Sequence, residues 1–346
     1  MPSAAIGAVD SPRREMALVD GWRFHRGPVE TASAVGFIDP AWEAVTLPHT
    51  WNAQDGQDGG ADYFRGDGWY RRRFRVDIEW AGKRVFLQFD GANRSAEDPF
   101  RLSTYASNGN VSERRAGYPD VIAFNHYFGW YRGEVEDFAP WLDQQHSLRP
   151  DLGIGMSEFG AGANVTQHEE NPRKPAPAGP WHPEEWQSHF HEVYWQALAQ
   201  RPWVWGKFIW NMFDFASDGR NEGSTPGRND KGLVTYDRKT RKDAFYWYKA
   251  NWSDEPVLYI TSRRFVARTQ PTTTVKIYSN AETVELLVNG VSLGKRTGAS
   301  RIFAWPDVQL AKGENRVEAR AVSGGCELED HCLWTYTPAP AGPEKE

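Results

Sequence analysis

A glutamate at the end of an apolar run is the first residue whose placement could do chemistry. Glu158 closes the run GIGMSE and is followed by FGAG. In a parallel barrel the reacting groups lie at the carboxyl ends of the strands, so this position suits a catalytic carboxylate. One chemistry that needs such a group is glycoside hydrolysis with retention, in which an ionised carboxylate attacks and a second carboxyl, roughly 5–5.5 Å away, supplies a proton. A helix N-cap or a strand-end salt bridge is the alternative interpretation.

Two further apolar runs end in polar and aromatic side chains. Asn125 and Tyr127 follow the run DVIAFN, and Trp210 and Asn211 close the run VWGKFIWN. A tyrosine hydroxyl can hydrogen-bond a carboxylate and keep it ionised. A tryptophan can form the floor of a sugar site, and the amide beside it can bond a hydroxyl. Core packing is the alternative for each aromatic residue taken singly, but the three strand ends together favour a site.

The loops that follow these runs supply further candidates. Asn229 and Lys231 lie in the turn NDKG, where a lysine could meet an anionic or hydroxylated substrate. His168 follows Glu158 on a loop, and a solvent-facing histidine is the alternative there. Three loop carboxylates could bond sugar hydroxyls or a cation, or simply be solvated: Asp214, Asp218 and Glu222.

The composition sets limits on the class of protein. The chain has 346 residues, enough for two or three domains, and a net charge of −6 without a basic stripe, so no nucleic-acid partner is expected. Aromatic residues are abundant, with 17 Trp, 13 Tyr and 18 Phe. Flat rings stack on the apolar faces of sugars, and aromatic residues also fit β-strands, so these counts favour sugar binding and a β-rich fold about equally.

The termini and the cysteines carry little functional signal. The only cysteines are Cys326 and Cys332, so no Cys/His metal site is expected, and a local disulfide is left open. There is no run of about 18 apolar residues that would span a membrane. Residues 1–15 lack the apolar core of a signal peptide, so we expect a cytoplasmic protein. The alternative is a periplasmic or secreted protein whose N-terminus is incomplete.

The pattern of apolar and polar residues changes along the chain. Short alternating runs and Gly-rich loops occupy residues 16–97, and they predict strands at 68–76 and 84–89. Residues 98–252 alternate apolar runs with helical segments, of which 183–199 is the clearest, and this order predicts βα units of a parallel barrel. Residues 253–337 alternate again and contain the hairpin signal Asn289-Gly290, which predicts a small immunoglobulin-like sandwich.

Ordered motifs then give the chain a family resemblance to glycoside hydrolase family 2. They are, in chain order, LPHTWN (47–52), GWYRR (68–72), FDGA (89–92), NHYFGWY (125–131), SEFG (157–160), FIWNMFDF (208–215), NDKGLV (229–234), DRKTRKDAF (237–245), SNAETVEL (279–286) and VNG (288–290). The resemblance covers about 16–337 and is closest to the β-galactosidases, with the β-glucuronidases as relatives.

The resemblance implies a multidomain fold, α/β plus all-β. It has a loose N-terminal arm, a partial jelly-roll β-sandwich for sugar binding, the C-terminal half of a (β/α)8 TIM barrel, an immunoglobulin-like β-sandwich and a disordered tail. These parts correspond to residues 1–15, 16–97, 98–252, 253–337 and 338–346.

The resemblance also assigns roles to individual residues. Glu158 matches the catalytic nucleophile, and Tyr127 matches the tyrosine beside it. Asn125 belongs to the same substrate-facing motif, and Trp210 matches the tryptophan that lines the sugar site. Substrate-binding residues further along the chain are Asn229, Lys231 and, from its loop position, His168.

The asparagine and lysine of NDKG match a pair that meets the sugar carboxylate in β-glucuronidases. The same pair occurs in β-galactosidase-like members, and the continuation Gly232-Leu233-Val234 with the appended sandwich favours a galactosidase. The expected function is therefore hydrolysis of terminal β-D-galactosides, with β-glucuronidase specificity as the alternative. No cofactor is expected, a structural or activating cation is left open, and the partners are a β-galactoside or related oligosaccharide, no membrane, and a second copy if the chain forms a homo-oligomer.

The family pattern breaks at the acid/base residue. A family member carries an Asn-Glu pair on the fourth barrel strand, but Asn221-Glu222 follows the last strand, and no such pair precedes Asn125. The sequence passes from jelly-roll to late-barrel motifs near Glu97-Asp98, as if a few hundred residues were deleted. General acid catalysis contributes about 10²–10⁴-fold, so we expect weak turnover of natural glycosides. A non-catalytic carbohydrate-binding remnant is the second hypothesis.

Overall fold

The computed structural model describes residues 16–47, 49, 64, 66–75, 78–80, 104–108, 120–298 and 300–338. The chain divides into two compact units, Met1–Ala92 and Asn93–Glu346. Several sequence predictions fall outside the described residues: the arm 1–15, the strand 84–89, the junction at Glu97-Asp98 and the tail beyond Pro338.

The first unit contains a small antiparallel sheet. Its strands are β1 (Trp22–Arg26), β2 (Glu43–Val45) and β3 (Gly68–Arg71), in the order β2-β1-β3, and a 3-10 turn covers Ile78–Trp80. β3 is shorter than the predicted strand 68–76. Residues 72–75 carry three arginines and have no partner strand in the described part of this unit, which is consistent with the early end of β3.

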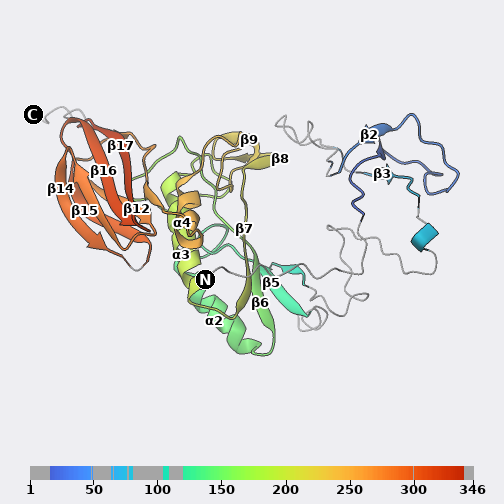
Figure 1. Cartoon of the computed structure of the whole chain (residues 1–346), viewed down its shortest axis with the longest axis horizontal. Coiled ribbons are helices and arrows are strands. Elements are labelled where there is room, and N and C mark those ends of the chain that lie inside the picture. Colours follow the sequence, from blue (N-terminus) through green and yellow to red (C-terminus); the bar gives the residue numbers. More distant parts are fainter. Residues whose placement is uncertain are drawn as a thin grey trace, which may run out of the picture. The chain divides into compact units, whose positions relative to one another are not determined.

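The second unit begins with a parallel sheet (Figure 1). Its strands are β4 (Ala106–Ser107), β5 (Val121–Asn125), β6 (Gly153–Phe159) and β7 (Val204–Ile209), in the order β4-β5-β6-β7. Apolar runs such as those of β5 and β6 suit strands that are covered on both faces. Within the described part of the chain, β4 pairs only with β5 and β7 only with β6, so both edges of this sheet are open.

Helices α2 (Phe138–Leu148), α3 (Glu184–Ala199) and α4 (Asp243–Trp252) lie together along one side of the sheet, and a 3-10 turn at Val135–Asp137 precedes α2 (Figure 1). The predicted helix 183–199 is confirmed, with Pro183 at the N-cap and acidic residues in the first turn of α3. Tyr194 of α3 stacks between Phe138 and Phe159 at centroid distances of 3.9 and 5.4 Å, which ties the helices to β6.

A β-hairpin follows β7, formed by β8 (Phe215–Glu222) and β9 (Thr225–Asn229). The sequence predicted a loop here, with carboxylates that either bond a sugar or a cation or are solvated. The solvated alternative is wrong, because Asp214, Asp218 and Glu222 are all buried. The hairpin places its residues next to the turn that carries Lys231.

The C-terminal region is a two-sheet β-structure. Its strands are β10 (Leu258–Ile260), β11 (Ala267–Arg268), β12 (Thr272–Ser279), β13 (Thr283–Val288), β14 (Val291–Thr297), β15 (Ile302–Gln309), β16 (Gly313–Ser323) and β17 (Cys326–Tyr336). They form sheets β10-β12-β15 and β11-β17-β16-β13-β14. The predicted hairpin is confirmed, since Asn289 and Gly290 adopt φ of 53° and 80° between β13 and β14, as a type I′ turn requires. Cys326 and Cys332 are both free thiols.

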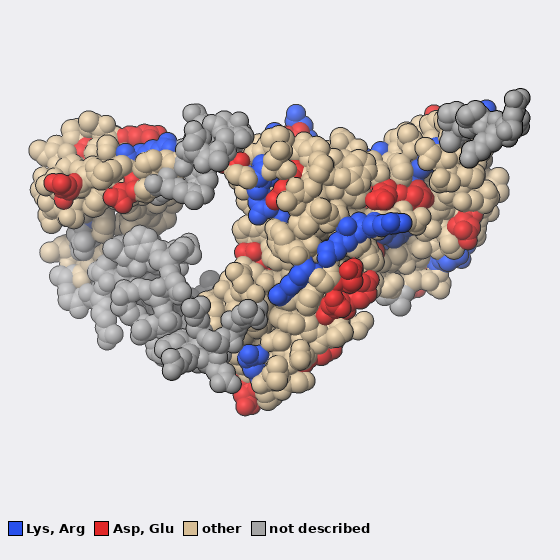
Figure 2. All heavy atoms as spheres, turned by 180° about the vertical axis from the view of Figure 1, so that it is seen from behind, with Lys and Arg blue, Asp and Glu red and all other residues tan. Residues whose placement is uncertain are grey.

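One face of the molecule shows where the charged side chains lie. On the side shown in Figure 2, most of the described surface is uncharged, and one continuous run of Lys and Arg residues lies between patches of Asp and Glu residues. Among the described residues, none of the helices has the length and apolar character needed to cross a bilayer.

Candidate functional site

The centre of the site is Glu158, the penultimate residue of β6. The hydroxyl of Tyr127 donates a hydrogen bond of 2.7 Å to Glu158 Oε2. Asn125 lies opposite Glu158 in the parallel register of β5 and β6, and its Oδ1 accepts a 2.7 Å hydrogen bond from Ser157 Oγ. Burial, and then the neighbouring carboxylate, raise the pKa of Tyr127 above its ordinary value, so the phenol stays protonated and able to donate. The strand ends thus join three of the predicted site residues.

Trp210 follows β7 and lies directly beside the end of β6. Its backbone N–H donates to the carbonyl of Phe159 over 2.8 Å, and its ring meets Phe215 edge-on at 5.5 Å. A Cβ on Gly160 would lie 1.9 Å from the Trp210 carbonyl oxygen. Only glycine therefore permits this approach, which explains why the residue two positions after Glu158 has no side chain.

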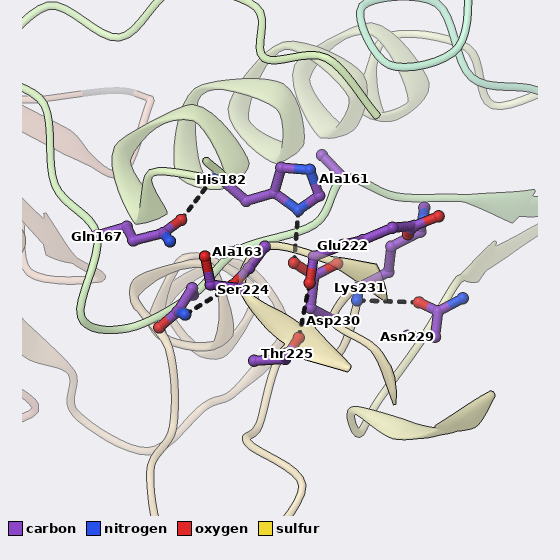
Figure 3. Close-up of polar contacts among 12 residues, drawn as sticks. Ala161, Ala163, Gln167, His182, Glu222, Ser224, Thr225, Asn229, Asp230 and Lys231 are labelled. Atoms are coloured by element: carbon purple, nitrogen blue, oxygen red, sulfur yellow. Dashed lines mark hydrogen bonds and ion pairs between the residues drawn. The ribbon is translucent and has the colours of Figure 1, made fainter. Parts of the chain in front are cut away.

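A backbone ladder extends from this point to the turn that carries Lys231. The N–H of Asn211 donates to the carbonyl of Lys231 over 3.0 Å, and the N–H of Leu233 returns to the carbonyl of Asn211. Asn229 is buried, and its Oδ1 accepts a 3.1 Å hydrogen bond from the N–H of Lys231 (Figure 3). The predicted pair is therefore held in one compact turn.

The side chain of Lys231 is almost completely buried, with an exposed fraction of 1%. Its Nζ lies 5.1 Å from the ring centre of Trp130 and 5.2 Å from that of Tyr131, and it has no hydrogen-bond partner among the described residues. Tyr131 in turn contacts the ring of Tyr127 at 5.1 Å. One aromatic wall thus connects the ammonium of Lys231 to the tyrosine that binds Glu158.

Glu222 and Arg220 of β8 complete this side of the site. Arg220 Nη1 donates to both carboxylate oxygens of Glu222 over 2.8 Å, and Lys231 Nζ lies 3.8 Å from Glu222 Oε2. Two cations thus share one carboxylate. The spacing of Arg220 and Glu222 by two residues on a strand places them on one face, and this alternation could have been read from the sequence.

His168 does not share contacts with these residues. Its Nδ1 lies 3.0 Å from Glu185 Oε1, its Nε2 lies 3.1 Å from the carbonyl of Val165, and its ring stacks on Phe265 at 5.4 Å. These contacts connect the loop after β6 with the C-terminal sheets. A substrate role for His168 stays a prediction from its loop position.

Asp214 stabilises the turn that carries Lys231. Its Oδ1 accepts hydrogen bonds of 2.8 Å from the N–H of Gly232 and from Lys242 Nζ. Lys242 also donates to the carbonyl of Asp230 over 2.8 Å. These bonds anchor the backbone on either side of Lys231. In the part of the chain that the structure describes, no group of three or more His, Cys, Asp or Glu residues could hold a metal ion.

Known proteins that resemble this chain are mainly β-glucuronidases. A curated β-glucuronidase from Bacteroides fragilis is 47% identical over 223 residues, which are 63% of this chain and 32% of that protein. The crystal structure of an FMN-binding β-glucuronidase from Faecalibacterium prausnitzii matches at 41% identity with a TM-score of 0.64, over 70% of this chain and 36% of that one. Bacteroides uniformis β-glucuronidase 2, covalently bound to cyclophellitol-6-carboxylate aziridine, matches at 35% identity with a TM-score of 0.63, over 71% and 30%.

The fold, the site and these matches define the chain as a relative of the β-glycosidases of glycoside hydrolase family 2. The chain is similar to β-glucuronidases at up to 47% identity. It is also similar to the crystal structure of a putative β-galactosidase from Bacteroides fragilis, at 38% identity with a TM-score of 0.66, over 70% of this chain and 36% of that one. A β-galactosidase from Bacteroides ovatus matches 95 residues at 38% identity. The chain spans 32% of the length of the curated B. fragilis relative. A model described as a domain of unknown function (DUF4982) matches residues 270–329, within the C-terminal sheets.

Proposed function

We propose that this chain carries the nucleophile and the uronic-acid pocket of a retaining β-glucuronidase. The observation that carries the proposal is the buried ammonium of Lys231, which has no hydrogen-bond partner among the described residues and is joined through Tyr131 and Tyr127 to Glu158. The identity to β-glucuronidases supports the same choice over the galactosidase expectation.

The charge of the pocket supports an anionic sugar. A buried ammonium costs several kcal/mol unless it is paired and hydrogen-bonded. Lys231 faces aromatic rings and shares Glu222 with Arg220, so its three N–H donors are unused. The two oxygens of a glucuronide carboxylate would accept hydrogen bonds from these donors, whereas the hydroxymethyl group of a galactoside offers a single uncharged oxygen.

The reaction available to these residues is the first half of a retaining mechanism. A carboxylate oxygen of Glu158 attacks the anomeric carbon, the glycosidic bond breaks, and the aglycone leaves with the bonding electron pair, which yields a glycosyl ester. Tyr127 donates to the carboxylate and holds it in one orientation. A phenol with strong electron-withdrawing groups departs without a proton, but an ordinary alcohol does not. We therefore propose slow turnover of natural glycosides, since the expected Asn-Glu pair is missing from the sequence.

The test compares 2,4-dinitrophenyl β-D-glucuronide with 2,4-dinitrophenyl β-D-galactoside in rapid-mixing experiments. The proposal predicts a burst of dinitrophenolate close to one equivalent per chain with the glucuronide, a much slower burst with the galactoside, and no burst for Glu158→Gln. A faster galactoside burst would support the galactosidase expectation. Equal release by Glu158→Gln would remove the nucleophile assignment, and binding without any release would favour a non-catalytic carbohydrate-binding protein.

A further inference from the structure

A buried histidine, His182, contacts the turn that carries Lys231. His182 is fully buried, and its Nδ1 lies 2.6 Å from Asp230 Oδ2 (Figure 3). Its Nε2 lies 3.1 Å from the carbonyl oxygen of Ala176. Both ring nitrogens therefore face oxygen atoms of other residues, which fixes the orientation of the ring. The two residues are 48 apart in sequence, and their contact is buried.

The same histidine touches both structures that surround the ammonium. Asp230 is the residue between Asn229 and Lys231, and the ring of His182 meets Trp130 edge-on at 4.8 Å. Trp130 is the tryptophan whose ring lies under Lys231 Nζ. His182 thus connects the backbone that bears the lysine with the ring beneath its amine.

The space around this pair is closed to other arrangements. A Cβ on Gly162 would lie 2.3 Å from Asp230 Oδ1, and one on Gly223 would lie 2.3 Å from Asp230 Oδ2. Burial opposes ionisation of Asp230, but the hydrogen bond and charge of His182, with Lys242 and Lys231, outweigh it and hold the pKa of the carboxyl below its ordinary value. The carboxylate is therefore charged, enclosed and oriented by His182.

We propose that His182, acting through Asp230 and Trp130, is a positioning residue that holds Lys231 in place for the carboxylate of an anionic sugar. This inference rests on the proposed uronic-acid pocket. It assigns the selectivity for an acidic over a neutral sugar to residues that do not contact the sugar themselves.

The effect of Asp230 variants on glucuronide binding distinguishes a positioning role from a purely electrostatic one. Its negative charge is close to the pocket, so removing the charge would strengthen the binding of an anion if only the field mattered. If position matters, Asp230→Ala weakens that binding because the turn loses its anchor. Asp230→Asn weakens it less, because the amide keeps a hydrogen bond to His182.

The experiment measures the dissociation constants of methyl β-D-glucuronide and methyl β-D-glucoside by isothermal titration calorimetry on the full chain. We expect His182→Gln and Asp230→Ala to weaken glucuronide binding about tenfold, the loss of one charge-assisted hydrogen bond, with glucoside binding unchanged. His191→Gln is the matched control, since His191 is equally buried but bonds Tyr248 instead, and it should leave both constants unchanged. Asp230→Asn, which is nearly isosteric, covers the case in which His182→Gln does not fold.

Each outcome separates this inference from the proposed function. If Lys231→Met does not weaken glucuronide binding, the uronic-acid pocket itself is wrong. If Lys231→Met weakens it but the His182 and Asp230 variants do not, only the positioning role is overturned. Tighter glucuronide binding by the Asp230 variants, or equal losses for both glycosides, would also overturn it.

Discussion

At the scale of single residues, the contact between Tyr127 and Glu158 is central to the proposed attack of the Glu158 carboxylate on a sugar. The hydrogen bond holds one carboxylate oxygen and leaves the other available. A hydrogen bond to a charged group contributes about 1.5–3 kcal/mol. In the proposed reaction, the orientation of the Glu158 carboxylate therefore depends on a residue that follows the neighbouring strand β5.

Replacing Tyr127 by Phe should slow the burst of dinitrophenolate from the activated glucuronide by about tenfold or more, the kinetic equivalent of that hydrogen bond. Tyr248→Phe is the control, because the hydroxyl of Tyr248 bonds His191 instead of the carboxylate. An unchanged burst rate in Tyr127→Phe would show that the contact has no part in the attack.

The sequence predicted several residue contacts and missed others for a clear reason. Glu158, Tyr127 and Asn125 end adjacent apolar runs, so their meeting at one edge of a parallel sheet follows from the pattern. The pair of His182 and Asp230 joins two loops, and tertiary contacts between loops leave no periodic signal in the sequence.

At the scale of the elements, the close approach of β6 and β7 depends on Gly160. Replacing it by Ala should lower the free energy of unfolding by about 1–3 kcal/mol, the usual cost of overpacking, because the new methyl group would overlap the Trp210 carbonyl. Urea denaturation measures this. Gly219→Ala, where a Cβ meets nothing within 4 Å, should change stability little. Equal stabilities for the two variants would show that the strand ends separate at no cost.

The burial of His191 between α3 and α4 predicts that the free energy of unfolding depends on pH. Burial, and then the charge of Lys242, lower the pKa of His191 to about 3, below its ordinary value of 6.5. Between these two pKa values the imidazole is protonated in the unfolded chain but not in the folded chain. The contribution of His191 to the free energy of unfolding is therefore complete above pH 6.5 and falls as the pH drops towards 3. The slope is at most about 1.4 kcal/mol per pH unit. His191→Gln should reduce this slope in urea denaturation between pH 6.5 and 3. An identical slope in the variant would contradict the assignment.

The predictability of the elements follows their pattern. α3 and the hairpin at Asn289-Gly290 have strong local signals, a Pro and acidic residues at the helix start and an Asn-Gly turn, and both form as predicted. The hairpin of β8 and β9 was missed because its polar residues, Asp218 and Glu222 among them, resemble a solvated loop. Their burial comes from tertiary contacts that local propensity does not report.

At the scale of the whole molecule, the absence of the expected Asn-Glu pair predicts that the second half of the proposed reaction, hydrolysis of the glycosyl ester, is slow. A retaining enzyme uses that residue first as an acid and then as a base that activates water. Azide attacks a glycosyl ester without a base, so it should accelerate steady-state release of dinitrophenolate from the activated glucuronide by about tenfold or more. Sodium chloride at the same ionic strength is the control. No acceleration would mean that another residue of the chain supplies the base.

The most direct test of the proposed nucleophile is to identify the residue to which a slow substrate becomes covalently attached. Incubation with 2,4-dinitrophenyl 2-deoxy-2-fluoro-β-D-glucuronide, followed by intact-mass and peptide mass spectrometry, should show one fluoroglucuronyl group per chain, on the peptide that contains Glu158. Glu158→Gln should stay unlabelled, and Lys231→Met should label much more slowly. No label on the unmodified chain, or a label on another residue, would contradict the assignment of Glu158 as the nucleophile of a uronic-acid site.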